Sequence, residues 1–343
     1  MKPDGSTDSA HPTPRADAAG QPHAADRRHS PDRRHSADSA EVADAMNRPH
    51  PVDAAASADS ADALTEPGEG GMPKVVLRHA SGAEADVYLH GAHVTRWRDA
   101  AGVERLFLSS RAVFSGDAAI RGGIPISFPQ FADLGPLPKH GFARTAEWTL
   151  VSASDAADGG ASEAVLRLDD TPLTRDLWPH AFTAELRVRL DERLSVQLTI
   201  RNTGGEPFDF TVALHTYLRV RDVGSVMVEG LEGVRFIDKV DGGEPKVEDS
   251  PHLRIGGETD RVYLDAPGDV HVRETDGGGV IVAREGFPDV VVWNPGAEKG
   301  NALSDMGPDE YRQMLCVEAA AAGTAVTLAP GASWTGATIL TPL

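Results

Sequence analysis

Two ionisable side chains lie inside strongly apolar segments of the sequence. His215 follows the apolar residues 210–214, and Glu318 lies within the apolar segment 314–320. A glutamate is rarely fully buried unless it is paired, so Glu318 either points into a site or ends a strand and points at water. His215 is open to two interpretations, a core histidine bonded to the backbone or a catalytic imidazole. The chemistry available to these two residue types is proton transfer.

A second group of polar residues lies in the stretch 119–144. Arg121, Lys139, His140 and Arg144 bring cationic or ionisable groups into it. Prolines and glycines recur so often there that neither a regular helix nor an interior strand can continue through it. Its isoleucines and phenylalanines are too apolar for solvent, so we expect this loop to be pinned to a core. A rigid, glycine-bearing loop with converging cations is suited to hold a small anion.

Asp260 and two histidines carry weaker signals. By itself, Asp260 reads as a turn aspartate. His90 and His93 resemble a metal-binding pair, but on a strand, a turn and a strand they would not share a face, and no further ligands lie nearby. The glycine pair at 122–123 matches no nucleotide-binding loop, and no Gly-x-Ser-x-Gly motif occurs. The sequence therefore favours neither a metal site nor a nucleotide site.

Short strands are expected to position these residues. Between 182 and 202, apolar and polar residues alternate on both sides of a turn at 191–193, which is typical of a half-buried antiparallel hairpin. Further strand-like runs occur at 74–79, 85–90, 91–97, 208–220, 226–229, 270–274, 280–284, 290–293, 314–319, 325–328 and 333–340. With one helical turn near 308–312, this pattern predicts an all-β fold, a large antiparallel β-sandwich.

Composition divides the chain near residue 72. Residues 1–71 contain almost no large apolar side chain, and we expect a disordered low-complexity extension because they cannot bury enough surface to offset their ordering entropy. They also lack the apolar run of a secretory signal. Residues 72–343 are long enough for one domain with a sizeable core.

Charge and cysteine content exclude several classes of protein. The formal net charge of -19 disfavours a nucleic-acid partner, whose phosphates would be repelled. No apolar run is long enough for a membrane span. The single cysteine, Cys316, excludes an intramolecular disulfide and fits a reducing compartment. We therefore expect a cytoplasmic protein without nucleic-acid or membrane partners.

A set of segments resembles, in the family's order, the hexose-6-phosphate 1-epimerases, the phosphosugar branch of the aldose 1-epimerase (galactose mutarotase-like) family. The segments are Gly91-Ala-His-Val-Thr95, Ile120-Arg-Gly-Gly-Ile-Pro-Ile-Ser-Phe-Pro129, His140-Gly-Phe-Ala-Arg144, Leu214-His-Thr-Tyr217, Asp260-Arg-Val-Tyr263, Val292-Trp-Asn-Pro295 and Cys316-Val-Glu-Ala319. They span nearly all of 72–343, and the ordered set makes the resemblance specific. It implies the family's β-sandwich, with a shallow sugar site across one sheet.

The resemblance also implies an activity, the interconversion of α and β anomers of a hexose 6-phosphate, with glucose 6-phosphate as the expected substrate. His215 matches the family's general acid and Glu318 its general base. Reference pKa values near 6.5 and 4.3 predict an ionised Glu318 whose charge favours a protonated His215. No metal or organic cofactor is required for this chemistry.

Other positions are matched in the same way. Arg121 and Arg144 match the arginines that hold the 6-phosphate, His140 the histidine that faces the sugar, and Asp260 a residue that bonds ring hydroxyls. Lys139 departs from the family, in which glutamine is common at this position. A lysine there would add phosphate affinity or alter which sugar fits.

Two alternatives of other classes stay open. One is a non-catalytic carbohydrate-binding or sensing module on the same sandwich, against which the intact His215 and Glu318 count. The other is a glycoside hydrolase, which needs two carboxylates at one glycosidic bond, whereas the partner of Glu318 is a histidine. The expected state is a monomer that acts on a small-molecule hexose 6-phosphate.

Overall fold

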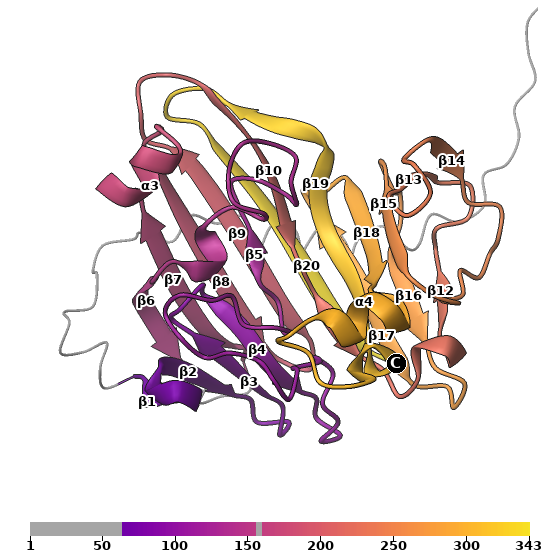
Figure 1. Ribbon diagram of the computed structural model, residues 1–343. Coiled ribbons are helices and arrows are strands. Elements are labelled where there is room, and N and C mark those ends of the chain that lie inside the picture. Colours follow the sequence, from indigo (N-terminus) through magenta and orange to yellow (C-terminus); the bar gives the residue numbers. More distant parts are fainter. Residues whose placement is uncertain (1–63, 156–159) are drawn as a thin grey trace, which may run out of the picture. The chain divides into compact units, whose positions relative to one another are not determined.

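The structure, a computed structural model, describes residues 64–155 and 160–343 (Figure 1). The extension was predicted for residues 1–71, and its first 63 residues lie outside the described part of the chain. Residues beyond it are folded: β1 (Glu66–Pro67) pairs antiparallel with β2 (Pro73–Arg78), and the 3₁₀ turn η1 (Glu69–Gly71) connects the two. The folded part thus begins before residue 72, because β1 finds a strand partner that its composition does not reveal.

The described strands form one small and two large sheets. The small sheet has the order β1, β2, β3 (Glu84–Tyr88) and β4 (His93–Arg98). The β19 sheet has the order β14 (Pro245–Val247), β13 (Arg235–Asp238), β15 (Thr259–Tyr263), β18 (Asp289–Asn294), β19 (Met314–Leu328), β10 (Phe208–Leu214) and β5 (Ile126–Ser127), and β11 (Tyr217–Arg219) also pairs with β19. The β20 sheet has the order β12 (Met227–Glu229), β16 (Val270–Arg273), β17 (Gly279–Glu285), β20 (Ser333–Pro342), β9 (Leu194–Asn202), β8 (Phe182–Leu190), β7 (Ser162–Asp169) and β6 (Thr149–Ser154).

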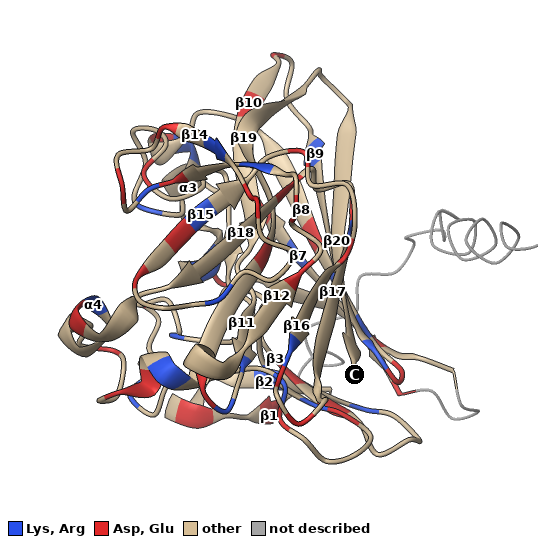
Figure 2. Cartoon of the chain, turned by 90° about the vertical axis from the view of Figure 1, so that its right-hand side faces the viewer, with Lys and Arg blue, Asp and Glu red and all other residues tan. Residues whose placement is uncertain are grey.

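The β19 and β20 sheets lie face to face around one hydrophobic core (Figures 1 and 2). Every second side chain of β8 and β9 is buried in that core, as the alternation in the sequence predicts, because successive side chains of a strand point to opposite faces. The pairings between these strands are antiparallel. The predicted all-β antiparallel sandwich is therefore confirmed.

β19 has two faces of different character. Leu315, Val317 and Ala319 belong to the core between the two large sheets. Cys316 and Ala320 belong to two smaller apolar clusters, and the alternation of the strand puts Glu318 on their side. The sequence predicted two strands in this region, but the structure has one, because β10 pairs with both halves across a register shift.

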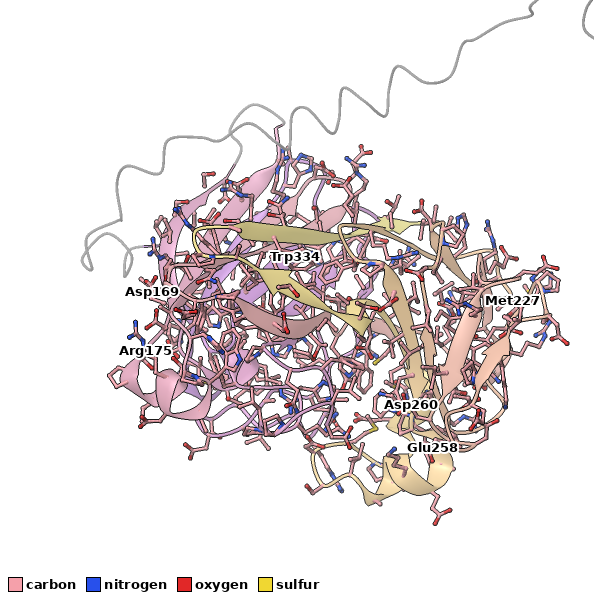
Figure 3. The ribbon with its side chains drawn as sticks, turned by 90° about the horizontal axis from the view of Figure 1, so that it is seen from above. Asp169, Arg175, Met227, Glu258, Asp260 and Trp334 are labelled. Carbon is pink, nitrogen blue, oxygen red and sulfur yellow. The ribbon has the colours of Figure 1, made fainter. Side chains whose placement is uncertain are left out.

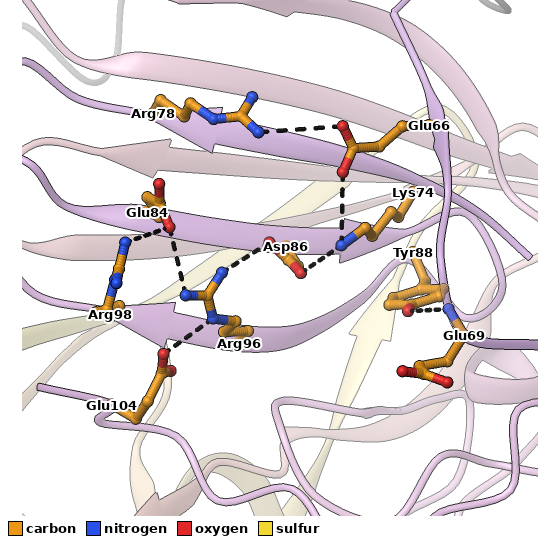
Figure 4. A network of polar contacts seen from close by, with 10 residues as sticks. All are labelled: Glu66, Glu69, Lys74, Arg78, Glu84, Asp86, Tyr88, Arg96, Arg98 and Glu104. Atoms are coloured by element: carbon orange, nitrogen blue, oxygen red, sulfur yellow. Dashed lines mark hydrogen bonds and ion pairs between the residues drawn. The ribbon is translucent and has the colours of Figure 1, made fainter. Parts of the chain in front are cut away.

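The small sheet carries a network of ion pairs (Figure 4). Asp86 Oδ2 lies 2.7 Å from Lys74 Nζ, and its other oxygen lies 3.8 Å from Arg96 Nη1. Glu84 Oε2 lies 3.3 Å from Arg96 Nη2 and 2.7 Å from Arg98 Nη2. Opposite charges on neighbouring strands favour their pairing. This network stabilises the small sheet. The loop 119–144 contacts this sheet through β4.

Helices contribute little to the fold. They are α3 (Pro172–Leu177), α4 (Gly296–Ala302), η2 (Ala143–Thr145), η3 (Val223–Ser225) and η4 (Glu310–Gln313). The turn η4 lies where the sequence predicted a helical turn, whereas α3 and α4 were not predicted. In the part of the chain that the structure describes, no helix combines the length and the apolar character needed to cross a membrane.

Candidate active site

The loop 119–144 is anchored by its apolar side chains, as predicted. Each of them is at most 7% exposed: Ile120, Ile124, Ile126, Phe128, Phe131 and Phe142. The short strand β5 inside the loop pairs with β10, placing Ser127 opposite Ala213. This pairing attaches the loop directly to the β19 sheet, next to the end of the strand that precedes His215.

Two buried histidines, His90 in the connection between β3 and β4 and His93 at the start of β4, bond to the backbone at and just before the start of the same loop. The Nε2 atom of His90 lies 2.8 Å from the carbonyl oxygen of Ala118, and that of His93 lies 2.7 Å from the carbonyl oxygen of Gly122. Gly123 has a φ of 63°, and a Cβ there would stand 2.2 Å from the carbonyl oxygen of Val94. Only glycine permits that approach. The His90 and His93 rings therefore position the loop.

The side chains of His215 and Glu318 lie next to each other. Their closest atoms, Nδ1 and Oε1, are 3.3 Å apart, and the residues are 7% and 1% exposed. The His215 ring stacks on Tyr217, with centroids 4.8 Å apart and planes 10° apart. It also meets His140 and Trp293 edge-on, at 5.3 and 5.9 Å. The two residues that the sequence singled out for proton transfer thus lie side by side.

Burial sets the protonation of this pair. Loss of solvent, followed by the neighbouring His140 and the positive charges of Arg144 and Arg121, lowers the pKa of His215 well below its ordinary value. Burial and then the charge of Asp260 raise the pKa of Glu318 well above its ordinary value. Both directions run against the expectation of an ionised Glu318 beside a protonated His215, because burial favours the neutral form of each group.

His140 presents a neutral hydrogen-bond donor. Its Nδ1 atom accepts from the backbone N–H of Ala132 at 3.3 Å and lies 2.8 Å from the hydroxyl oxygen of Ser127. A ring nitrogen that accepts an N–H bond is unprotonated, so the ring proton is on Nε2. Burial, with the charges of Arg144, Lys139 and nearby cations, lowers the pKa of His140 to about 3.

The two arginines differ in their partners. Arg121 donates through Nε and Nη2 to one oxygen of Asp305, at 3.1 and 3.0 Å, and through Nη1 to the Tyr217 hydroxyl at 2.9 Å. Arg144 donates only to the backbone carbonyl of Lys139, at 2.7 Å, and none of the described carboxylates forms an ion pair with it. Burial, and then the charge of Arg121, lowers the pKa of Arg144.

The remaining predicted residues lie around this centre. Asp260 belongs to β15 instead of a turn, because its backbone pairs with Trp293 of β18, and it lies beside Glu258 and α4 (Figure 3). Burial raises the pKa of Asp260. Lys139 is exposed, and its ammonium has no ion-pair partner among the residues described. Asp260 is thus close to the acid–base pair, and Lys139 lies at the periphery.

Strand register explains why distant segments converge here. Asp260 pairs with Trp293, Trp293 with Cys316, and Cys316 with Tyr217. Side chains in one such row point to one face, and Glu318 is two residues along the same strand. Trp293, which sequence reasoning expected to shape the pocket, lies edge-on to His215. Tyr217, Asp305 and Lys239 are nearby residues to which sequence reasoning assigned no contact, and only Tyr217 carried a signal, as an aromatic residue within a matched segment.

One cluster of metal-ligating atom types occurs among the described residues. The side chains of His215, Cys316 and Glu318 bring one potential ligand atom each to within 4.8 Å of one another. Metal ligands must be deprotonated. Burial raises the pKa of the Cys316 thiol well above its ordinary value, and it raises that of Glu318 as well. Two members of this cluster, His215 and Glu318, are the residues that the sequence singled out for proton transfer.

The fold and the site are those of an antiparallel β-sandwich that places a buried imidazole–carboxylate pair on one sheet, near two arginines from the adjoining loop. The pattern of the family described as aldose 1-epimerase matches residues 73–341, and the chain belongs to this family of isomerases. A relative from Cenchrus ciliaris, named as a candidate glucose-6-phosphate 1-epimerase, is 42% identical over 274 residues, which cover 78% of this chain and 83% of the relative.

Two bacterial relatives agree with this assignment. A protein of Escherichia coli K12 with the same name is 38% identical over 250 residues, covering 72% of this chain and 82% of the relative. A crystal structure from Salmonella typhimurium, described as a candidate mutarotase, is 31% identical and superposes with a TM-score of 0.73, covering 79% of this chain and 90% of that chain. The resemblance inferred from the sequence segments is confirmed.

Proposed function

We propose that the protein interconverts the α and β anomers of a hexose 6-phosphate, with glucose 6-phosphate as the substrate. The observation that carries the proposal is the position of Arg144. Its half-buried guanidinium acts on the His215 side of the acid–base pair and forms no ion pair with the described carboxylates. A guanidinium meets phosphate oxygens with a planar fork, so a phosphate group supplies the charge that Arg144 lacks.

The reaction needs two coordinated proton transfers. Glu318 takes the proton of the anomeric hydroxyl, and the electron pair of that O–H bond forms the C1=O1 double bond. The C1–O5 bond breaks, its electrons go to the ring oxygen, and His215 gives that oxygen a proton. The open aldehyde turns about C1–C2 and closes on its other face with the transfers reversed. A positioned acid or base typically contributes about 10²–10⁴-fold.

The phosphate has a second effect, on the proton shared by the pair. Burial favours the proton on Glu318, and His140 together with Arg144 and Arg121 opposes a charged His215. A phosphate dianion bound at these arginines offsets their field. The proton then moves the short distance to His215 and leaves Glu318 ionised. Both states contain one proton, so substrate binding converts a resting pair into a reactive one without proton uptake.

The remaining residues supply substrate contacts. His140 donates from Nε2 to a sugar oxygen, and the carboxylate of Asp260 accepts from ring hydroxyls. Asp305 and Tyr217 hold Arg121 through three hydrogen bonds, which fixes the orientation of its guanidinium. This arrangement supports binding through hydroxyls and phosphate together, as a hexose 6-phosphate requires.

The first prediction concerns Arg144→Ala. Because a hydrogen bond to a charged group contributes about 1.5–3 kcal/mol, the Michaelis constant for glucose 6-phosphate should rise about 10–100-fold. The constant for unphosphorylated glucose should stay nearly unchanged. Anomer exchange followed by saturation-transfer NMR measures both constants.

The matched control is Arg193→Ala, in the exposed turn between β8 and β9, which should leave both constants at the wild-type value. Equal losses for the phosphorylated and the free sugar in the Arg144 variant would show that this arginine does not bind the phosphate.

A further inference from the structure

Tyr217 contacts both parts of the site with one side chain. Its hydroxyl oxygen accepts a hydrogen bond from Nη1 of Arg121 at 2.9 Å. Its ring stacks on the His215 ring, with centroids 4.8 Å apart and planes 10° apart. The residue is only 2% exposed, so solvent does not compete for either contact. One buried side chain therefore joins the arginine assigned to the phosphate to the imidazole assigned to proton transfer.

The backbone of Tyr217 is bonded to the loop that carries Arg121. The backbone N–H of Tyr217 donates to the carbonyl oxygen of Gly123 at 2.9 Å. In the same way, the backbone N–H of His215 donates to the carbonyl oxygen of Pro125 at 3.0 Å. These two bonds fix the backbone of both residues against one short segment of the loop. The phosphate arginine and the acid are thus joined through the backbone as well as through the Tyr217 side chain.

Other aromatic side chains restrain the Tyr217 ring. Trp293 lies edge-on to both Tyr217 and His215, with centroids 6.0 and 5.9 Å away. Phe107 stacks on Tyr217 at 6.5 Å, with planes 26° apart, and belongs to the same apolar cluster. Aromatic rings attract one another at centroid separations of about 4.5–7 Å. Because the hydroxyl is rigidly attached to the ring, these contacts also fix the point at which Tyr217 meets Arg121.

The separation of Arg121 and His215 matters for a hexose 6-phosphate. Its phosphate is carried on C6, which is joined through C5 to the ring oxygen that His215 protonates. A phosphate held by Arg121 therefore brings that oxygen to His215 only if the two side chains stand at the right distance. A misplacement of about 1 Å can cost about 10²-fold in rate. Asp305 also holds Arg121, at 3.1 and 3.0 Å, but among the described residues it forms no hydrogen bond with His215.

We propose that Tyr217 is a positioning residue that sets the distance between the bound phosphate and the acid, because its hydroxyl holds Arg121 while its ring holds His215. The proposal rests on the proposed function for the identity of the substrate. Its two contacts can be removed separately, since phenylalanine keeps the ring and lacks the hydroxyl.

The kinetic test begins with Tyr217→Phe, which removes the hydrogen bond to Arg121 and keeps the stack on His215. The turnover number kcat for glucose 6-phosphate should fall about tenfold, because the phosphate no longer places the sugar at a fixed distance from the acid. Its Michaelis constant should rise as well, since a hydrogen bond to a charged group is lost. The kcat for unphosphorylated glucose, which Arg121 does not position, should stay at the wild-type value.

Tyr217→Leu removes both contacts, and Tyr217→Met does so with a flexible side chain that fills the space if the leucine variant does not fold. In either variant kcat should fall about tenfold for free glucose as well as for glucose 6-phosphate, because the His215 ring loses its support. The matched control is Tyr88→Phe. Tyr88 is 3% exposed, and its hydroxyl accepts from the backbone N–H of Glu69 in the small sheet (Figure 4), so this variant should leave kcat unchanged.

A readout without substrate separates this proposal from the proposed function. A stacked aromatic ring moves the NMR resonance of the His215 Cε1 proton upfield, and this resonance is the one that His215→Asn removes. It should stay in place in Tyr217→Phe and move downfield in Tyr217→Met. A wild-type kcat for glucose 6-phosphate in Tyr217→Phe, or an unmoved resonance in Tyr217→Met, would overturn the proposal. Absence of exchange in the wild-type protein would instead refute the proposed function and leave the resonance result standing.

Discussion

His93, His140 and His215 are each at most 8% exposed, and loss of solvent is the largest cause that lowers the pKa of each. For His93 the pKa falls to about 4 and for His140 to about 3. Such a histidine stays neutral in the folded chain while its unfolded counterpart, with a pKa near 6.5, takes up a proton. Its contribution to stability is present above pH 6.5 and is lost as the pH falls towards the folded pKa.

A pH-dependent stability measurement tests this account of His93. Between about pH 6 and pH 4.5, His93 alone should lower the free energy of unfolding by about 1.4 kcal/mol per pH unit as the pH falls. His93→Gln keeps a donor for the Gly122 carbonyl but does not titrate, so its urea-unfolding free energy should depend less steeply on pH by that amount. Identical slopes in the two proteins would contradict a buried, neutral His93.

The His215–Glu318 pair should not add to this slope. In the folded protein the directions of the two pKa shifts favour the proton on Glu318, and between the two reference pKa values the unfolded chain holds one on the histidine. The pair therefore exchanges few protons with solvent on unfolding in that range, although each of its members has a strongly shifted pKa.

Sequence reasoning singled out His215 and Glu318, which the structure places side by side, because they are ionisable groups in apolar strands, and it singled out the loop arginines because they stand among apolar anchors. It missed Lys239 and Asp305, since each lies in a polar, irregular stretch where many charged residues are equally plausible. Their positions depend on strand pairing that joins segments far apart in the chain. The protonation of the pair was misjudged because reference pKa values contain no burial term.

At the scale of elements, the small sheet positions the loop that carries the cations. β4 supplies His93, and the backbone of Val94 accepts from the N–H of Ile124 at 2.8 Å. The ion-pair network of the small sheet centres on Asp86, which is 7% exposed and lies between Lys74 and Arg96. A buried carboxylate with two cationic partners is costly to remove, because Lys74 and Arg96 each lose one of their ion-pair partners.

Asp86→Asn should therefore lower the free energy of unfolding by about 1–3 kcal/mol, which is less than for a fully buried pair because Arg96 is partly exposed. Chemical denaturation measures this change, and the kinetic constants should be retained at temperatures where the variant is folded. The control is Glu66→Gln, which removes a half-exposed partner of the same Lys74 and should cost less than about 1 kcal/mol. Equal losses in the two variants would show that Asp86 is not the centre of the network.

The elements that sequence analysis predicted well are those with strict alternation, such as β8 and β9, in which each apolar residue faces the core. β15 was missed because Asp260 follows glycines and polar residues, and only its pairing with β18 makes it a strand. α3 did carry a readable signal. Thr171 accepts a hydrogen bond from the N–H of Thr174, and Pro172 opens the helix.

At the scale of the whole molecule, the formal net charge of -19 repels anions, so a phosphorylated substrate requires a local concentration of cations. The fold brings two such cations towards His215, Arg121 from the loop 119–144 and Arg144 from η2. The β19 sheet presents Glu318 from an interior strand, and the core on its other face fixes that strand. The cations and Glu318 thus reach the site from different elements of the fold.

The most direct test of this account is anomer exchange measured by saturation-transfer NMR on glucose, galactose and mannose, each with and without a 6-phosphate. The account predicts rapid exchange for glucose 6-phosphate, much slower exchange for each unphosphorylated sugar at equal concentration, and no enzymatic exchange in Glu318→Gln or His215→Asn. Equal rates for phosphorylated and free sugars, or wild-type exchange of glucose 6-phosphate in either variant, would contradict it.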